Sequence, residues 1–200
     1  MLKVYGHAMS RAVRTMWMCE ELGIPYELVG ADALGGLKSP QFLKLNPNGH
    51  IPVIDEDGFV LYESMAINLY LAAKHQRLWP SKPDEQALCV QWSFWGMMET
   101  EGFALQALQH RLLLPAERRE EAKALAALES LRKPFQVIDD HLRGRTALVG
   151  GEFSVADLNA SAILSWARVA KADLAPYPSL DAWLGACLGR PAFKTARGRK

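Results

Sequence analysis

The 200-residue sequence has almost no excess of charge and no long apolar run, and each lack argues against a class of protein. Its 23 Lys and Arg residues are balanced by 22 Asp and Glu, so a net charge of +1 gives no reason to expect a nucleic-acid partner. No apolar run is long enough to span a bilayer. Lys3, Gly6 and His7 interrupt the apolar residues that follow Met1, so the start of the sequence does not have the pattern of a signal peptide. We therefore expect a cytoplasmic protein with no membrane partner.

Cysteine is also scarce. The three cysteines, Cys19, Cys89 and Cys187, are odd in number and far apart. They form no C-x-x-C pair and no metal-binding spacing with the five histidines, so the sequence predicts no metal site. Each lies among apolar neighbours in a predicted helix, which favours buried structural thiols in a reducing compartment.

The most informative part of the sequence is the stretch 46–71. Two apolar runs, 51–54 and 59–61, are separated by a turn that contains Gly58, a pattern typical of a β-hairpin. Glu63-Ser64 then begins a pattern of apolar residues at helical spacing. The hairpin is therefore expected to lead directly into a helix whose first turn offers N–H groups and a hydroxyl to a carboxylate.

Pro52 lies at the beginning of this hairpin. Proline cannot donate to a strand ladder, and a cis bond before it would turn neighbouring backbone groups toward a ligand. Together, Gly49-His50-Ile51-Pro52-Val53 and Glu63-Ser64-Met65-Ala66-Ile67 resemble the glutathione-binding half of glutathione transferases. Each motif alone is as well explained by an ordinary hairpin or a capped helix.

The sequence before this stretch predicts a β-α-β unit. A strand over 2–5 is followed by a helix that begins at Ser10 and ends at Gly23, and then by a strand over 26–29. This order implies a parallel pair of strands with a right-handed crossover. With the hairpin and the Ser64 helix, it completes a small four-stranded domain.

The sequence after residue 85 shows no convincing strand. We expect a helix boundary or kink at Pro134, a capping box formed by Ser154 and Asp157, and a final helix over 179–188. The resemblance implies an α/β N-terminal thioredoxin-like domain followed by an all-α helical-bundle domain. The predicted boundaries are 1–75 for the first domain, 76–84 for a linker and 85–200 for the second domain.

Ser10 is the candidate catalytic residue. A thiol reacts as the thiolate, which a hydrogen-bond donor and a nearby helix N-terminus stabilise. The segment from Val4 to Ser10 is similar to the start of phi-class transferases, so the resemblance implies that the Ser10 hydroxyl activates glutathione. Two alternatives stay open: Ser10 is only a helix cap, or Tyr5 is the donor, as a tyrosine is in other classes.

The resemblance also implies how the charged groups of glutathione are bound. Glu63 holds the α-ammonium, while Ser64 and the helix N-terminus hold the neighbouring carboxylate. The backbone of Ile51 pairs with the cysteinyl amide. Lys38 and His50 bind the glycine carboxylate, although each alone would more often be an ordinary surface residue.

The second substrate is expected to be an apolar electrophile. A predicted helix of the second domain offers an apolar wall, although such residues are more often core than pocket. The candidate residues are Trp92, Trp95, Met97, Met98 and Phe103.

The leading hypothesis is a glutathione transferase, a homodimer that uses glutathione as co-substrate and has no tightly bound redox cofactor. It would conjugate the thiolate to an apolar electrophile, with a possible peroxidase side activity. The alternative is a non-catalytic ligand-binding or scaffold protein on the same fold. Leu37 and Asn48 depart from the phi pattern and leave the class open.

Overall fold

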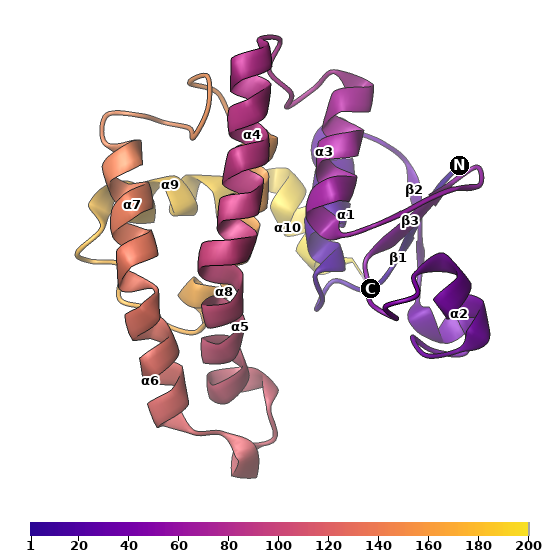
Figure 1. The fold of residues 1–200 in the computed structure, drawn as a ribbon, viewed down its shortest axis with the longest axis horizontal. Helices are drawn as coiled ribbons and strands as arrows, with labels where there is room; N and C mark the ends of the chain where they lie inside the picture. The colour runs from indigo at the N-terminus through magenta and orange to yellow at the C-terminus, as the bar shows by residue number, and fades with distance from the viewer. Residues whose placement is uncertain (200) are drawn as a thin grey trace. The chain divides into compact units, whose positions relative to one another are not determined.

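The computed structural model describes residues 1–199, and its contacts divide the chain into two structural units (Figure 1). The first unit contains Met1–Trp79 together with the C-terminal segment from Gly189. The second unit contains Pro80–Leu188. The division after Trp79 falls within the segment 76–84 that the sequence predicts as a linker.

The first unit is built on a four-stranded mixed sheet. In spatial order the strands are β2 (Tyr26–Val29), β1 (Leu2–Tyr5), β3 (Val53–Glu56) and β4 (Phe59–Tyr62). β1 pairs parallel with β2 and antiparallel with β3, and β4 completes the hairpin. This is the thioredoxin-like arrangement that the sequence predicts.

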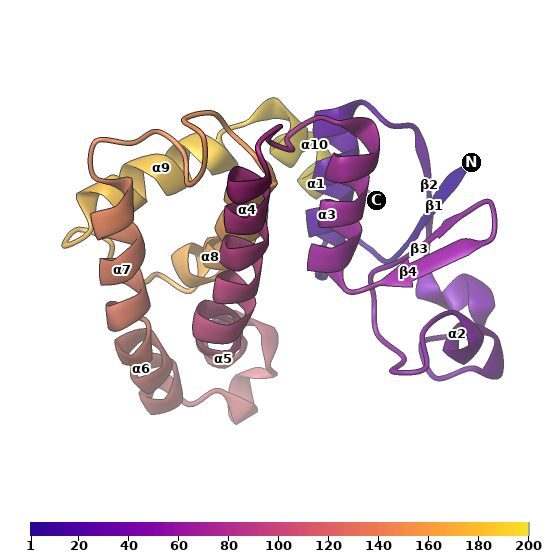
Figure 2. The ribbon, with the colours of Figure 1, turned by 45° about the horizontal axis from the view of Figure 1, so that its top comes forward.

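Helices cover both faces of this sheet. Helices α1 (Ala12–Leu22) and α3 (Ser64–His75) lie side by side on one face (Figure 1, Figure 2). Between β2 and β3 the chain forms a 3-10 helix (Ala31–Leu34) and helix α2 (Pro40–Leu45). Phe42 of α2 packs against Tyr5 and Val53, which are paired neighbours on β1 and β3. Because side chains alternate along a strand, the buried pair Val4 and Ile54 faces the other helices.

β3 begins two residues later than the predicted run 51–54. The Ile51–Pro52 peptide bond is cis, and the first ladder residue is Val53, which pairs with Tyr5 on β1 and with Tyr62 on β4. Proline lacks the N–H that the ladder requires, so the strand starts after it. The segment before β3 is therefore a bend rather than a strand end.

The C-terminal helix α10 (Pro191–Gly198) packs on α1 within the first unit. Arg190 donates two hydrogen bonds to the Glu21 carboxylate, at 2.6 and 2.8 Å. The Phe193 ring lies 4.7 Å from the Trp17 ring, centroid to centroid. The predicted second domain, 85–200, includes this segment, because nothing local in the sequence indicates that it returns to α1.

Replacing Phe193 with alanine should therefore destabilise the first unit. We expect the free energy of unfolding to fall by about 2 kcal/mol, less than for a fully buried phenylalanine, because Phe193 is only half-buried. Chemical denaturation of the variant measures this loss. The matched control is Lys194→Ala at the exposed neighbouring position, and equal stability of the two variants would contradict the docking role of Phe193.

The second unit contains only helices among its described residues. α4 begins at Pro83, inside the predicted linker, because proline is well tolerated in the first turn of a helix. The helices in chain order are α4 (Pro83–Trp95), a π-helix (Gly96–Glu101), α5 (Gly102–Leu108), a second π-helix (Gln109–Leu113), a 3-10 helix (Ala116–Arg118), α6 (Glu121–Ser130), α7 (Arg132–Leu142), α8 (Val155–Val169) and α9 (Pro178–Leu188).

The helix boundary predicted near Pro134 is present three residues earlier. α6 ends at Ser130, α7 begins at Arg132, and Leu131 lies between them. Pro134 then occupies the third position of α7. Its missing N–H costs nothing there, because the first-turn N–H groups have no partner within the helix.

The predicted capping box is present at the start of α8, with Ser154 as the N-cap and Asp157 at the third helical position. The Asp157 side chain is fully buried and accepts hydrogen bonds from the Leu148 and Ser154 N–H groups, at 2.8 and 3.0 Å. It also accepts from the Ser154 hydroxyl at 3.0 Å and from the Trp183 indole at 2.8 Å. Burial raises the pKa of Asp157, and these hydrogen bonds act in the opposite direction. Asp157 thus connects α8 to α9 and to the preceding loop.

Within residues 1–199, the helices are all too short or too polar to cross a membrane.

Candidate functional site

The loop between β1 and α1 is held close to the segment before β3 by Gly6. Gly6 has a φ of 151°, and a Cβ built on it would lie 2.3 Å from the Ala12 Cβ and 3.7 Å from Ile51. Only glycine permits this approach. The first turn of α1 and Ile51 are therefore neighbours across Gly6, and Ser10 belongs to the same loop.

Ser10 lies two residues before α1, whose first helical residue is Ala12 rather than the predicted residue after Ser10. Its hydroxyl oxygen accepts the Ala12 N–H at 3.1 Å, and its hydroxyl donates to the His7 carbonyl at 2.7 Å. The cap-like function is thus visible in the structure. To donate a hydrogen bond to a ligand, the hydroxyl must rotate away from the His7 carbonyl. Its role as a hydrogen-bond donor to a thiol therefore stays a prediction.

Tyr5, the alternative donor, is a core residue. Its side chain is 6% exposed and packs edge-on against Phe42, with ring centroids 6.4 Å apart. The same cluster contains Val53 and the half-buried Ile51. This packing gives Tyr5 a structural role in the core of the first unit.

Glu63 and Ser64 stand at the junction of β4 and α3. Glu63 has a φ of 75°, which is uncommon for a residue with a side chain, and its side chain is exposed. Ser64 is the first residue of α3 and is 4% exposed. Non-glycine residues at positive φ cluster at functional sites, so the conformation of Glu63 is consistent with a binding role.

Arg14 is a residue of this region that sequence reasoning missed. It is fully buried in α1, and its Nη1 donates to the Ser64 hydroxyl oxygen at 3.4 Å. The only signal in the sequence is a single charge among apolar residues, between Val13 and Met16. Such a charge is more often found at a helix surface, so the pattern alone does not reveal its burial.

Lys38 and His50 are brought to the same loop. Lys38 donates from Nζ to the Asn48 carbonyl at 3.0 Å, and a Cβ built on Gly49 would lie 2.7 Å from that Nζ. Both Lys38 and His50 are exposed. Two positive or ionisable side chains therefore border one short segment, as an anion site requires.

Asn46 shapes this loop and was also missed. It is 2% exposed, donates from Nδ2 to the His50 carbonyl at 2.8 Å and accepts the Asn48 N–H at 3.0 Å. An asparagine before a proline-containing turn is a local signal that sequence reasoning could have used. The turn positions the His50 backbone next to the Ile51–Pro52 bond.

The three cysteines have the surroundings of structural thiols. All three are buried and hold no disulfide. Burial raises the pKa of Cys19 to about 12, helped by the neighbouring Glu20 carboxylate, and burial likewise raises the pKa of Cys89. Burial therefore disfavours the reactive thiolate form of these two side chains at neutral pH.

The residues proposed for an apolar wall are divided between core and surface of the second unit. Trp92 is 5% exposed and packs between Trp95 and His141, at ring distances of 5.0 and 4.7 Å. Met98 and Phe103 are 77% and 39% exposed. Trp92 is therefore a core residue, and the exposed pair are the better candidates for ligand contact.

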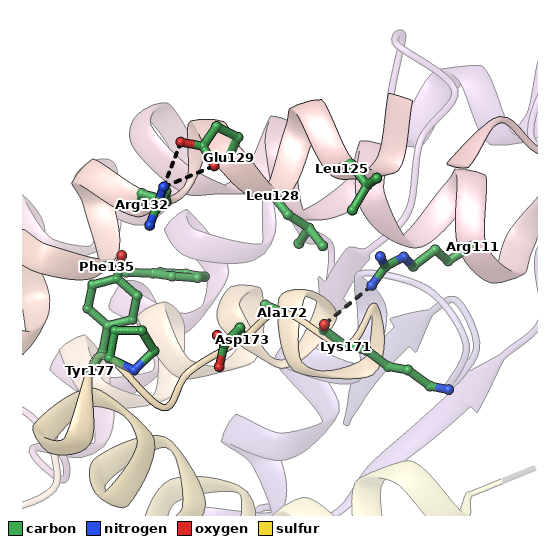
Figure 3. Close-up of a pocket in the computed structure, with 11 residues that line it drawn as sticks. Arg111, Leu125, Leu128, Glu129, Arg132, Phe135, Lys171, Ala172, Asp173 and Tyr177 are labelled. Carbon is green, nitrogen blue, oxygen red and sulfur yellow. Dashed lines mark hydrogen bonds and ion pairs between the residues drawn. The ribbon is translucent and has the colours of Figure 1, made fainter. Parts of the chain in front are cut away.

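A cavity of about 340 Å³ lies wholly in the second unit, between α6, α7 and the segment 171–177 (Figure 3). No residue predicted for glutathione lines it. Two of its cations are held by the protein itself, since Arg132 donates to Glu129 at 3.0 Å and Arg111 donates to the Lys171 carbonyl at 3.3 Å. These two guanidinium groups are therefore already hydrogen-bonded within the second unit.

The groups in the first unit suit a small molecule with separated charges. They comprise a hydroxyl beside α1, an exposed carboxylate and a buried hydroxyl at the start of α3, and two basic side chains at the 48–50 loop. Among residues 1–199 there is no cluster of His, Cys, Asp and Glu that could hold a metal ion.

Two family models match the chain: "Glutathione S-transferase, N-terminal domain" over residues 1–73 and "Glutathione S-transferase, C-terminal domain" over residues 103–191. Glutathione S-transferase 3 from Zea mays is 33% identical, over 96% of this chain and 91% of its own length. The theta class glutathione S-transferase from Xanthomonas axonopodis pv. citri, solved with glutathione bound, superposes with a TM-score of 0.90 at 29% identity, covering 100% of this chain and 98% of its own.

One relative carries a different kind of name. Elongation factor 1-gamma from Danio rerio is 32% identical over 80% of this chain, but the match covers only 36% of its own length. A sequence of this kind therefore also occurs as part of a larger protein.

Proposed function

The chain belongs to the glutathione S-transferase family, as its two motifs predicted, and we propose that it transfers glutathione to an apolar electrophile. The observation that carries the proposal is the placement of Ser10 just before α1 and of Glu63 and Ser64 at the beginning of α3, two helices that pack together. Helix beginnings stabilise negative charge, and the proposed ligand presents a thiolate and carboxylates.

The charged ends of glutathione suit the side chains of the first unit. The exposed Glu63 carboxylate attracts the α-ammonium, and Ser64 with the α3 N-terminus donates to the adjacent carboxylate. The Ile51 backbone, immediately before the cis bond, pairs with the cysteinyl amide. Lys38 and His50 attract the glycine carboxylate at the other end.

Ser10 is the proposed activating residue. Its hydroxyl leaves the His7 carbonyl and donates to sulfur, which favours the thiolate at neutral pH. Each unit by which the thiol pKa falls corresponds to about 1.4 kcal/mol of differential stabilisation. The thiolate then attacks the electrophilic carbon, forming a C–S bond, while the leaving group departs with the electron pair of the bond that breaks. The thiol proton passes to solvent.

A second candidate function is a binding or scaffold protein without turnover. Two observations favour it: the Ser10 hydroxyl is engaged by His7, and a relative named elongation factor contains a similar segment. Glutathione binding without any lowering of its thiol pKa would identify this second function.

Because the chain belongs to this family, we also propose that it is a cytoplasmic homodimer and that it has a peroxidase side activity. The peroxidase proposal needs only the same activated thiolate. A solution mass equal to a single chain would contradict the dimer.

Glutathione binding tests the proposal directly, in the parent protein and in Glu63→Gln. We expect the parent to bind glutathione and the variant to bind about tenfold more weakly, because the amide cannot neutralise the ammonium. Isothermal titration calorimetry measures both dissociation constants. Glu27→Gln, an exposed position on β2, is the matched control and should bind like the parent. No binding by the parent would overturn the proposed function.

A further inference from the structure

Arg14 is a fully buried cation at the contact between α1 and α3. Charged side chains are almost never completely buried unless they are paired or hydrogen-bonded, because removing a charge from water is costly. Its position opposite the start of α3 therefore calls for a functional explanation, since an apolar residue would pack there at a lower cost.

Two contacts tie Arg14 to the first turns of α3. Its Nη1 donates to the Ser64 hydroxyl oxygen at 3.4 Å, and its backbone carbonyl accepts from Asn68 Nδ2 at 3.3 Å. Ser64 and Asn68 are one helical turn apart, and both are buried. The guanidinium is thereby held against the same end of α3 that is proposed to bind the ligand carboxylate.

The donor and acceptor chemistry of this contact sets the direction of the Ser64 hydroxyl. A guanidinium has donors only, so Ser64 Oγ must accept from Arg14, and its own hydrogen points elsewhere. A carboxylate has acceptors only, so it needs that hydrogen. The buried positive charge adds a weakly screened attraction, because the surrounding protein has a low dielectric constant.

We propose that Arg14 is a positioning residue that presets the Ser64 hydroxyl to donate to the α-carboxylate of the γ-glutamyl group. This inference rests on the proposed function, since it assumes that glutathione is the ligand. Arg14 acts through Ser64 and through its charge, and no direct contact between Arg14 and the ligand is needed.

The test compares glutathione with 4-aminobutyryl-cysteinylglycine, which lacks only that α-carboxylate. Calorimetry gives the ratio of the two dissociation constants for the parent, Arg14→Met and Ser64→Ala. We expect the parent to prefer glutathione by about tenfold or more, the range of a hydrogen bond to a charged group. In Arg14→Met the preference should fall to about threefold or less, with the analogue bound as in the parent.

A purely structural role for Arg14 predicts a different result. If Arg14 only supports packing, both ligands weaken together and the ratio stays at the parent value, which would overturn the inference. Thr15→Val is the matched control, a buried neighbour on α1 whose replacement keeps the shape of the side chain, and its ratio should equal that of the parent.

Arg14→Lys keeps the proposal testable if the methionine variant does not fold. Lysine keeps the charge but loses the rigid fork that reaches Ser64, so the preference for glutathione should fall about threefold. An unchanged ratio in a folded Arg14→Lys protein overturns the role of Arg14 while leaving the proposed function intact. A parent protein that binds neither ligand overturns both.

Discussion

The Ser10→Ala variant is expected to lose about 100- to 1000-fold in kcat/KM for glutathione conjugation, the effect of removing one donor from a developing or full negative charge. Glutathione should still bind, because its charged ends are held by other residues. The loss in kcat/KM therefore arises in the chemical step rather than in the binding of glutathione. Ser10 also accepts the Ala12 N–H, so the variant should be about 1 kcal/mol less stable, which is too little to unfold the protein.

The decisive measurement is an ultraviolet titration of the glutathione thiol bound to the parent and to Ser10→Ala. We expect a thiol pKa well below the free value of about 8.5–9 in the parent and a return to that value in the variant. Tyr5→Phe is the matched control, since it removes the alternative hydroxyl but keeps the ring that packs on Phe42. A thiol pKa in Tyr5→Phe that stays as low as in the parent supports Ser10 as the activating residue.

Two other outcomes of this titration would contradict the role of Ser10. A lowered pKa that persists in Ser10→Ala and disappears in Tyr5→Phe would transfer the activating role to Tyr5. A pKa that is not lowered even in the parent would replace conjugation with the binding or scaffold function.

The second large effect concerns stability. Asp157→Ala should lower the free energy of unfolding by about 3–5 kcal/mol, because it removes one acceptor from several buried donors at once. The Leu148 N–H, the Ser154 N–H and the Trp183 indole N–H would all lose their partner. A cavity left by the carboxylate adds to the cost.

Chemical denaturation of the parent, Asp157→Ala and Asp157→Asn measures this effect. The asparagine variant keeps the shape and one acceptor oxygen, but its NH₂ group faces the Ser154 N–H, so its stability should lie between the other two. Asp173→Ala, an exposed aspartate of the same unit, is the control and should change stability by less than about 1 kcal/mol. A loss below that value in Asp157→Ala would contradict the role of Asp157.

Features encoded by neighbouring residues could be predicted from the sequence. The strand over 2–5, the end of α1 at Gly23, the hairpin around Gly58 and the Ser154–Asp157 box all depend on residues a few positions apart. The family could be predicted for the same reason, because its two motifs, 49–53 and 63–67, are short and contiguous. Local hydrogen bonding and the alternation of apolar residues are sufficient to specify such features.

Features set by packing between distant segments could not be predicted. The contact of Arg14 with Ser64 joins positions 50 residues apart, and that of Arg190 with Glu21 joins positions 169 apart. The sequence could not show that α10 returns to the first unit, or that Trp92 is a core residue. Nor could it show that the Ser10 hydroxyl donates a hydrogen bond to the His7 carbonyl.

The sequence by itself therefore determined the family and the order of the strands, and it proposed candidate site residues but missed Arg14 and Asn46. The tertiary structure alone decided which side chains are buried, which hydroxyl accepts and which donates, and which helix completes the first unit. The physical reason is that burial and hydrogen-bond direction depend on what a side chain faces after folding. A residue type and its sequence neighbours do not specify that partner.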